Sequence, residues 1–176
     1  MTEGEVLLKF AKYYASVKHA GQTYSNGLPY THHLAAVEEV LLRFNWSGHV
    51  HADEKLRAAA WLHDVVEDTG TKLKEIHEMF GETVAFYVGA VTNEEGPNRK
   101  VRHALTYPKT REAGPAAVRL KLADRIANVE AGGSLVSMYA KEHEDFKRML
   151  YTPGQNEDMW KCLDTHLGLH EMADWK

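Results

Sequence analysis

The sequence predicts an all-α protein, built as a single compact helical bundle over residues 1–176. Three observations predict this fold. Apolar residues recur every three or four positions along most of the chain, which is the spacing of amphipathic helices. No alternation of apolar and polar residues is long enough for a strand. No internal repeat, low-complexity segment or linker interrupts the chain, and 176 residues are enough for one domain with a substantial core.

Capping and breaking residues set the expected helix boundaries. Thr2 and Glu5 have the spacing of a capping box at the start of the first helix. Asp53 and Thr71 are suitable N-caps for two later helices, and Pro115 suits a first helical turn. The expected helices cover residues 3–18, 31–44, 54–66, 72–80, 82–92, 99–106, 115–131, 134–151 and 156–173. The expected loops include residues 21–29, 67–70, 93–98 and 107–114.

Composition and charge exclude several classes of function. The chain has 21 basic and 25 acidic residues and a formal net charge of −4, which gives no electrostatic case for binding nucleic acid or an anionic membrane. It has no apolar run near 18 residues and no signal-peptide pattern. Its single cysteine, Cys162, excludes an internal disulfide and makes the cytoplasm the default location. No pattern indicates an oligomeric state.

The stretch AAAWLHDVVEDT, at residues 58–69, concentrates the chemically useful side chains. Its second half carries five potential metal or proton ligands, which are His63, Asp64, Glu67, Asp68 and the hydroxyl of Thr69. His63 shares a helix face with the apolar residues Leu56 and Ala59, so it is expected to be buried. Burying imidazole and carboxylates together is costly unless they are paired or coordinate a metal. The alternative is a solvated acidic helix end beside one core histidine.

Three expected helices bring metal-type ligands to their inward faces. These candidate ligands are His33, His63, Asp64 and Asp124. Two imidazoles and two carboxylates suit Mn²⁺, Fe²⁺, Co²⁺ or Zn²⁺, and the absence of thiolates argues against a structural zinc site. Such a metal would lower the pKa of bound water and polarise a phosphoryl oxygen. Glu67 and Asp68, just beyond the ligand pair, could position that water or take its proton.

The H…HD…D pattern resembles that of the HD-domain metal-dependent phosphohydrolases. The similarity is closest to the hydrolase domain of RelA/SpoT homologues, and especially to the stand-alone small alarmone hydrolases. Four stretches carry it, namely KHAGQ at 18–22, GLPYTHHLAAV at 27–37, AAAWLHDVVEDTG at 58–70 and RLKLADRIANV at 119–129. The resemblance covers a motif-bearing core at about residues 10–130, and residues 134–173 form a helical C-terminal extension.

The resemblance implies a role for individual residues. The metal, usually Mn²⁺, would be held by His33, His63, Asp64 and Asp124. Glu67 and Asp68 match the acidic pair proposed to activate the attacking water, and Asn128 matches a residue that contacts the nucleotide. The implied reaction removes pyrophosphate from the 3′ position of guanosine tetra- or pentaphosphate. The implied partner is therefore a small nucleotide.

The segment after Gln22 departs from the family pattern. Family members usually have two or three basic residues there, whereas this chain has Thr23, Tyr24 and Ser25. Fewer positive charges leave room for another nucleotide, such as a dNTP, a nucleoside monophosphate or NADPH. Two alternatives therefore stand beside the alarmone hydrolase. One is an HD-type nucleotidase or dNTP triphosphohydrolase, and the other is a non-catalytic nucleotide-binding module.

Other side chains could supply the substrate contacts. Arg125 directly follows a candidate ligand and is the first choice for a positive charge facing the phosphates. Lys18 and Lys121 are further candidates, and Arg99, Lys100 and Lys109 could also contribute. Tyr139 could wall the pocket, because aromatic rings stack on nucleobases.

Overall fold

The computed structural model describes residues 1–44 and 50–169, and of residues 50–53 only the backbone is described. All regular elements in this part of the chain are helices, so the all-α prediction is confirmed. Thr23 and Pro29 form an isolated antiparallel bridge within the loop before the second helix. The helices are α1 (Glu3–Lys18), α2 (Thr31–Arg43), α3 (Val50–Leu62), α4 (Val65–Asp68), α5 (Leu73–Phe80), α6 (Glu82–Val91), α7 (Arg99–Glu112), α8 (Pro115–Glu130), α9 (Ser134–Leu150) and α10 (Glu157–His166).

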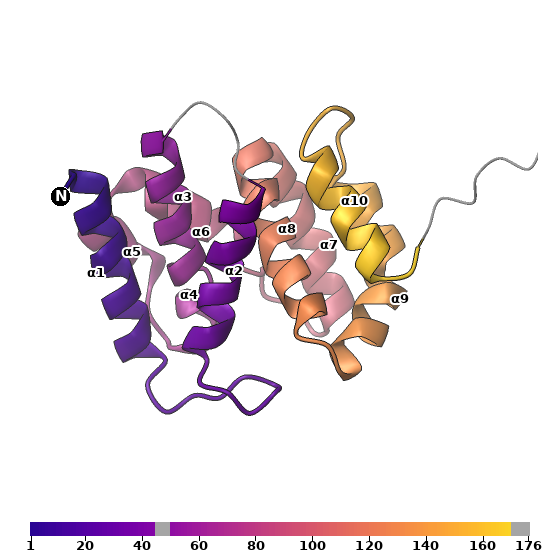
Figure 1. The fold of residues 1–176 in the computed structure, drawn as a ribbon, viewed down its shortest axis with the longest axis horizontal. Coiled ribbons are helices and arrows are strands. Elements are labelled where there is room, and N and C mark those ends of the chain that lie inside the picture. The colour runs from indigo at the N-terminus through magenta and orange to yellow at the C-terminus, as the bar shows by residue number, and fades with distance from the viewer. Residues whose placement is uncertain (45–49, 170–176) are drawn as a thin grey trace, which may run out of the picture.

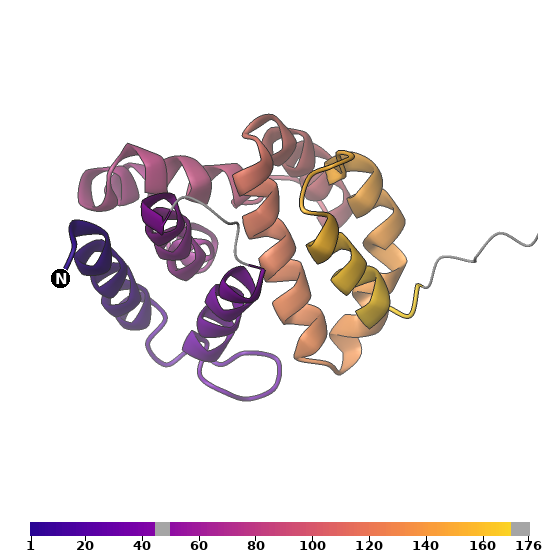
Figure 2. The ribbon, with the colours of Figure 1, turned by 45° about the horizontal axis from the view of Figure 1, so that its top comes forward.

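Two helices, α3 and α8, organise the bundle. Helix α3 packs against α1, α2 and α6, whereas α8 packs against α2, α6, α9 and α10. In Figures 1 and 2, α1 to α5 lie on one side of α8, and α9 and α10 lie on the other. Helix α2 contacts both organising helices, so its first turn brings side chains to the region where α3 ends and α8 passes.

One hydrophobic cluster extends from Leu8 in α1 to Leu163 in α10. Helix α8 is buried around most of its circumference, and its buried positions include the polar side chains of Lys121, Arg125 and Asn128. Burying such groups costs free energy unless they are paired or hydrogen-bonded. Their presence on this helix therefore indicates that polar contacts are concentrated along it.

The central helix differs from the prediction at both ends. It begins at Val50, so Asp53 lies inside α3 and is not its N-cap. It ends at Leu62, and α4 starts at Val65 after a turn at His63 and Asp64. The side chain of Asp64 does not cap α4, because its Oδ2 accepts a hydrogen bond from the Tyr30 hydroxyl at 2.6 Å. Apolar periodicity could not predict this two-residue interruption between α3 and α4, because a hydrogen bond from a distant residue stabilises it.

Helix α7 continues where a loop was predicted. It runs through Pro108 to Glu112, and residues 107–112 are helical. Proline removes one backbone donor from the helix, but neighbouring side chains hold this segment in place. Tyr107 is buried, and the Thr110 hydroxyl donates to the carbonyl of Ala90 at 2.7 Å. The helix ends before Gly114, whose φ of 98° lies in the region that favours glycine.

The ends of α1, α5 and α10 can also be compared with the predicted boundaries. The capping box of Thr2 and Glu5 is confirmed. The N-cap of α5 is Lys72, and the Thr71 hydroxyl instead lies 2.8 Å from the Thr69 hydroxyl. Helix α10 ends at His166, earlier than predicted, and residues 170–173 of the predicted helix lie outside the described residues. No helix in the described ranges is both long and apolar enough to cross a bilayer.

Candidate active site

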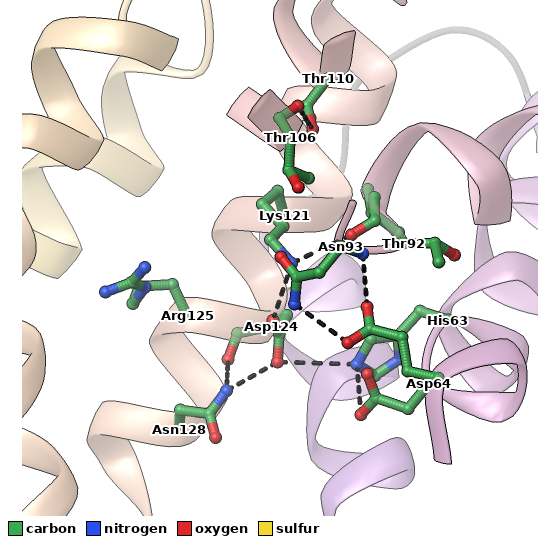
Figure 3. A network of polar contacts seen from close by, with 12 residues as sticks. His63, Asp64, Thr92, Asn93, Thr106, Thr110, Lys121, Asp124, Arg125 and Asn128 are labelled. Carbon is green, nitrogen blue, oxygen red and sulfur yellow. Dashed lines mark hydrogen bonds and ion pairs between the residues drawn. The ribbon is translucent and has the colours of Figure 1, made fainter. Parts of the chain in front are cut away.

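A cavity of about 190 Å³ lies where α2, α4 and α8 meet. Three of the four predicted metal ligands line it, and the fourth, His63, is buried behind them. His33 comes from the first turn of α2, His63 and Asp64 from the turn between α3 and α4, and Asp124 from the middle of α8. Segments far apart in sequence thus converge, as Figure 3 shows for α8 and the α3–α4 turn.

The four side chains form a compact group, which we call the ligand cluster (His33, His63, Asp64 and Asp124). The Nε2 atom of His33 lies 3.6 Å from Asp64 Oδ2 and 3.3 Å from Asp124 Oδ1. The Nε2 atom of His63 lies 3.0 Å and 3.6 Å from the same two oxygens. Two nitrogens and two oxygens therefore point at one small volume, and three of the residues, His33, His63 and Asp64, have ligand atoms spaced to hold one ion.

His63 is prepared to act as a ligand. Its Nδ1 atom lies 2.7 Å from the carbonyl oxygen of Ala60. Since a carbonyl only accepts, the hydrogen of the neutral ring sits on Nδ1, and Nε2 carries a lone pair. This Nε2 atom is buried and has no hydrogen-bond partner. A buried polar atom without a partner is costly, and a cation between the two aspartates would satisfy it, so the donor set fits a divalent metal.

Electrostatics also favour a cation in the ligand cluster. Burial opposes the charged form of His63, but Asp64 and Asp124 outweigh it and raise the pKa of the imidazole well above its usual range. Burial likewise acts against the carboxylates, but the histidines lower the pKa of Asp64 to about 2 and that of Asp124 well below its usual range. The cluster thus holds two anions that attract positive charge, either a proton on a histidine or a metal ion.

A second layer of side chains orients the two carboxylates. The Tyr30 hydroxyl donates to Asp64 Oδ2 at 2.6 Å. The amide of Asn128 donates to Asp124 Oδ1 at 2.6 Å and to the Asp124 carbonyl at 2.8 Å (Figure 3). The Lys121 ammonium lies 3.8 Å from the other oxygen of Asp124. Such contacts fix the direction in which a ligand presents its lone pairs.

The acidic pair at the end of α4 lines the same cavity. Both oxygens of Glu67 accept from Asn93, one from its backbone N–H at 2.6 Å and the other from its side-chain amide at 3.0 Å. Burial, followed by the negative charge of Asp64, raises the pKa of Asp68 above its usual value. A higher pKa makes the Asp68 carboxylate a better proton acceptor.

Cationic and aromatic side chains also line the cavity, and we call this part of the lining the cationic wall. Arg99, Lys121, Arg125 and Tyr139 line the cavity there. The Arg125 guanidinium lies 4.2 Å from the centre of the Tyr139 ring and donates to the Tyr107 hydroxyl at 2.8 Å. The Lys121 ammonium donates to the carbonyl of Val91 at 3.1 Å. The cavity is therefore lined by positive charge as well as by carboxylates, which suits a phosphorylated ligand near a metal.

Sequence reasoning missed several residues of this site. Glu142 accepts from Arg99 at 2.7 Å and from Arg125 at 3.3 Å, and so ties together the two arginines of the cationic wall. His103 also lines the cavity, and burial, followed by Arg99, lowers its pKa to about 4. Asn93 holds Glu67. The sequence predicted the helices and the loop that carry these residues. Helix periodicity does not show which of their side chains reach the site.

Of the candidate substrate contacts, Lys100 and Lys109 do not line the cavity, and neither does Lys18. Its ammonium lies 3.1 Å from Glu75 Oε1 and 5.1 Å from the centre of the Tyr14 ring. The other predicted substrate contacts, Lys121, Arg125, Asn128 and Tyr139, all line the cavity.

Comparison with known proteins identifies the family. Residues 11–153 match the family described as HD domain. The chain therefore belongs to the HD-domain family, as the motifs indicated.

Two relatives with named activities are similar to this chain. The chain is 32% identical over 118 residues to the guanosine-3′,5′-bis(diphosphate) 3′-pyrophosphohydrolase MESH1 of Danio rerio, covering 66% of this chain and 63% of the relative. It is 37% identical over 169 residues to the enzyme of the same activity name from Aquifex aeolicus, covering 92% of this chain and 22% of the relative. The chain thus spans less than two thirds of these relatives.

A solved structure shares the fold. It is described as a metazoan ortholog of SpoT that hydrolyses ppGpp and plays a role in starvation responses. The TM-score is 0.79 at 24% sequence identity, and the match covers 97% of this chain and all of that chain. The similarity extends through the C-terminal helices, beyond the segment that carries the sequence motifs.

Proposed function

We propose that this protein is a metal-dependent hydrolase that removes pyrophosphate from the 3′ position of guanosine 3′,5′-bis(diphosphate). The observation that carries the proposal is the ligand cluster itself. In it the buried His63 Nε2 lies 3.0 Å from an oxygen of Asp64 and 3.6 Å from an oxygen of Asp124, and both carboxylates line a cavity that also has cationic side chains. The names of the relatives support the choice of substrate.

In this proposal all four residues of the ligand cluster hold the metal. HD-domain proteins use a divalent metal, and we propose Mn²⁺, with Zn²⁺, Co²⁺ or Fe²⁺ as alternatives, because the donors are imidazoles and carboxylates without thiolates. A metal bound there supplies Lewis acidity toward a phosphoryl oxygen and lowers the pKa of water. Tyr30 and Asn128 keep the two carboxylates directed at it.

Asp68 and Glu67 would handle the attacking water. Asp68 is the proposed proton acceptor, because burial and the charge of Asp64 raise its pKa above its ordinary value. Glu67, held by two hydrogen bonds from Asn93, still has carboxylate lone pairs that can orient the water. The arrangement supports attack on phosphorus from the acidic side of the cavity.

The cationic wall would bind the remaining phosphates. Lys121 and Arg125 project from α8, next to Asp124 in sequence, and Tyr139 offers a ring on which a base can stack. Water attacks the phosphorus bonded to O3′, the P–O3′ bond breaks, and O3′ leaves with GDP and takes up a proton. Fixed positive charges stabilise the negative charge that develops on the phosphoryl oxygens.

We also propose that the chain forms one hydrolase domain acting in the cytoplasm. The continuous hydrophobic cluster from α1 to α10 supports the single domain. Cys162, a free cysteine, is compatible with a reducing compartment.

A product assay tests the reaction. Purified protein with Mn²⁺ would be given guanosine 3′,5′-bis(diphosphate), its adenosine counterpart, NADPH and dNTPs separately, with products resolved by ion-exchange chromatography. We expect GDP and pyrophosphate from the guanosine substrate, and an Asp68→Asn variant slowed by about 10²–10³-fold as expected for loss of a general base. The matched control is Asp145→Asn, an exposed aspartate paired with Arg148. No pyrophosphate release from the bis(diphosphate) would contradict the proposal.

A nucleotidase or dNTP triphosphohydrolase is the second candidate. The uncharged segment Thr23, Tyr24 and Ser25 favours it, because a substrate with fewer phosphates needs fewer positive charges at the cavity entrance. Release of phosphate or triphosphate from the 5′ end of a deoxynucleotide, without turnover of the bis(diphosphate), would select this function.

A further inference from the structure

Tyr24 occupies an unusual place beside the ligand cluster. It belongs to the loop between α1 and α2, where its backbone N–H donates to the Leu28 carbonyl at 2.8 Å and its own carbonyl accepts from Gly27 at 2.8 Å. The neighbouring Thr23 and Pro29 form an antiparallel bridge. These contacts close the loop on itself and fix the direction in which the Tyr24 side chain leaves it.

The Tyr24 ring lies flat on a ligand of the cluster. Its plane is parallel to the His33 imidazole, with an interplanar angle of 0° and 4.7 Å between ring centres. Tyr30 meets both rings edge-on, 5.8 Å from Tyr24 and 5.7 Å from His33. The imidazole is thereby limited on two sides by aromatic rings, which restricts its rotation.

The Tyr24 hydroxyl reaches a second ligand through an amide. It is hydrogen-bonded to Asn128 Oδ1, and Asn128 Nδ2 donates to Asp124 Oδ1 at 2.6 Å. An amide oxygen only accepts hydrogen bonds, so the Tyr24 hydroxyl is the donor to Asn128 Oδ1. This donor faces the amide oxygen, and the amide nitrogen accordingly faces the carboxylate of Asp124.

We propose that Tyr24 is a positioning residue of the metal centre, which holds His33 with its ring and Asp124 through Asn128. This inference rests on the metal site of the proposed function. In this role Tyr24 supports the metal ligands at a position where family members usually have a basic residue. The amide of Asn128 is engaged by Tyr24 on one side and by Asp124 on the other, so in this chain Asn128 supports a ligand.

Metal affinity is the direct test. Mn²⁺ alone would be titrated into wild-type, Tyr24→Phe and Tyr24→Ala protein by calorimetry, with Tyr13→Ala as a matched control, because Tyr13 is 68% exposed. Loss of a partner of a ligand costs about 10–100-fold in metal affinity. We expect a loss in that range for Tyr24→Ala and about tenfold or less for Tyr24→Phe, which keeps the stacked ring. Tyr13→Ala should bind as the wild type does.

Kinetics and folding controls separate the possible roles. We expect Tyr24→Phe to lower kcat at a fixed subsaturating Mn²⁺ concentration without changing KM for the nucleotide, and to keep the melting temperature of the metal-free protein. A higher KM with unchanged Mn²⁺ affinity would make Tyr24 a substrate contact and overturn the inference. Unchanged affinity in both Tyr24 variants would also overturn it. Absence of Mn²⁺ binding by the wild type would instead overturn the proposed function, and the inference with it.

Discussion

Two buried charged groups in this protein differ in how their polar atoms are used. The first is the ligand cluster. The second, which we call the Glu38 cluster, joins α1, α2 and α3 through Lys12, Glu38, Arg57 and Trp61. Both oxygens of Glu38 are occupied: Arg57 donates to one at 2.6 Å, and the Trp61 indole and the Lys12 ammonium lie 2.7 Å and 2.6 Å from the other.

The ligand cluster is incomplete in comparison. Its two carboxylates face two histidines, but His63 Nε2 has no hydrogen-bond partner, and the group borders a cavity. A buried charged group that satisfies its own atoms contributes to the fold. A cluster whose two carboxylates line a cavity can instead accept a cation from solution. The comparison predicts that mutations in the two clusters have separable consequences.

The largest effect is expected from Asp64→Asn, which removes a charged ligand and keeps the side-chain volume. Metal catalysis is worth several kcal/mol of transition-state stabilisation, so turnover should fall by about 10³-fold or more. Steady-state release of pyrophosphate measures this, alongside Mn²⁺ retention after gel filtration. Asp145→Asn is the control. Turnover within threefold of the wild type would remove Asp64 from the mechanism.

Glu38→Gln should act on stability and spare the chemistry. Removing one partner of a buried ion pair costs about 3–5 kcal/mol, and because Lys12 and Arg57 keep some contact with solvent, we expect about 3 kcal/mol. Urea unfolding followed by circular dichroism measures the change. The matched control is Glu78→Gln, whose exposed pair with Lys74 should contribute about 0.5 kcal/mol or less. A destabilisation no larger than that of the control would end the distinction between the clusters.

The Glu38 cluster should also make stability depend on pH. Burial opposes ionisation of Glu38, but hydrogen bonds from Lys12, Trp61 and Arg57 outweigh it and lower the pKa of the carboxyl below its ordinary value. A lowered pKa in the folded state gives stability that is present above the unfolded value, about 4.3, and is lost as the pH falls through the folded value. Unfolding free energies measured between pH 3 and 7 should therefore decline more steeply on acidification in the wild type than in Glu38→Gln. Parallel curves would be inconsistent with this role.

A smaller effect is expected from Tyr30→Phe. This change removes the hydroxyl that donates to Asp64 Oδ2 at 2.6 Å and leaves the ring in place. Loss of such a ligand partner should weaken Mn²⁺ binding about tenfold, as measured by calorimetry, with Tyr13→Phe as the control. Identical Mn²⁺ affinities for Tyr30→Phe and the control would show that the hydroxyl does not support the ligand.

The two clusters also show what the sequence could and could not predict. Helices and their inward faces follow from local periodicity, so the positions of His33 and Asp124 on converging helices, and of His63 near the end of a third, could be predicted. The turn at His63 and Asp64 was missed, because the partner that holds it, Tyr30, lies 34 residues away. No local pattern specifies that contact.

The same limit explains the remaining differences. Pro108 reads as a helix breaker, yet α7 continues through it because Thr110 bonds to a different helix. Lys18 belongs to a matching motif, but its neighbour Glu75 comes from α5 and pairs with it away from the cavity. Glu142 ties Arg99 to Arg125 across three helices. Tertiary pairs of this kind depend on the complete arrangement of helices, which periodicity does not contain.

The most direct test of the central claim is anomalous diffraction from crystals of the protein grown with Mn²⁺. The account predicts one strong anomalous peak among His33, His63, Asp64 and Asp124, within coordination distance of their nitrogen and oxygen atoms, and loss of that peak in Asp64→Asn. A structure from the same conditions with no peak in the ligand cluster, or with Mn²⁺ bound only elsewhere, would contradict it.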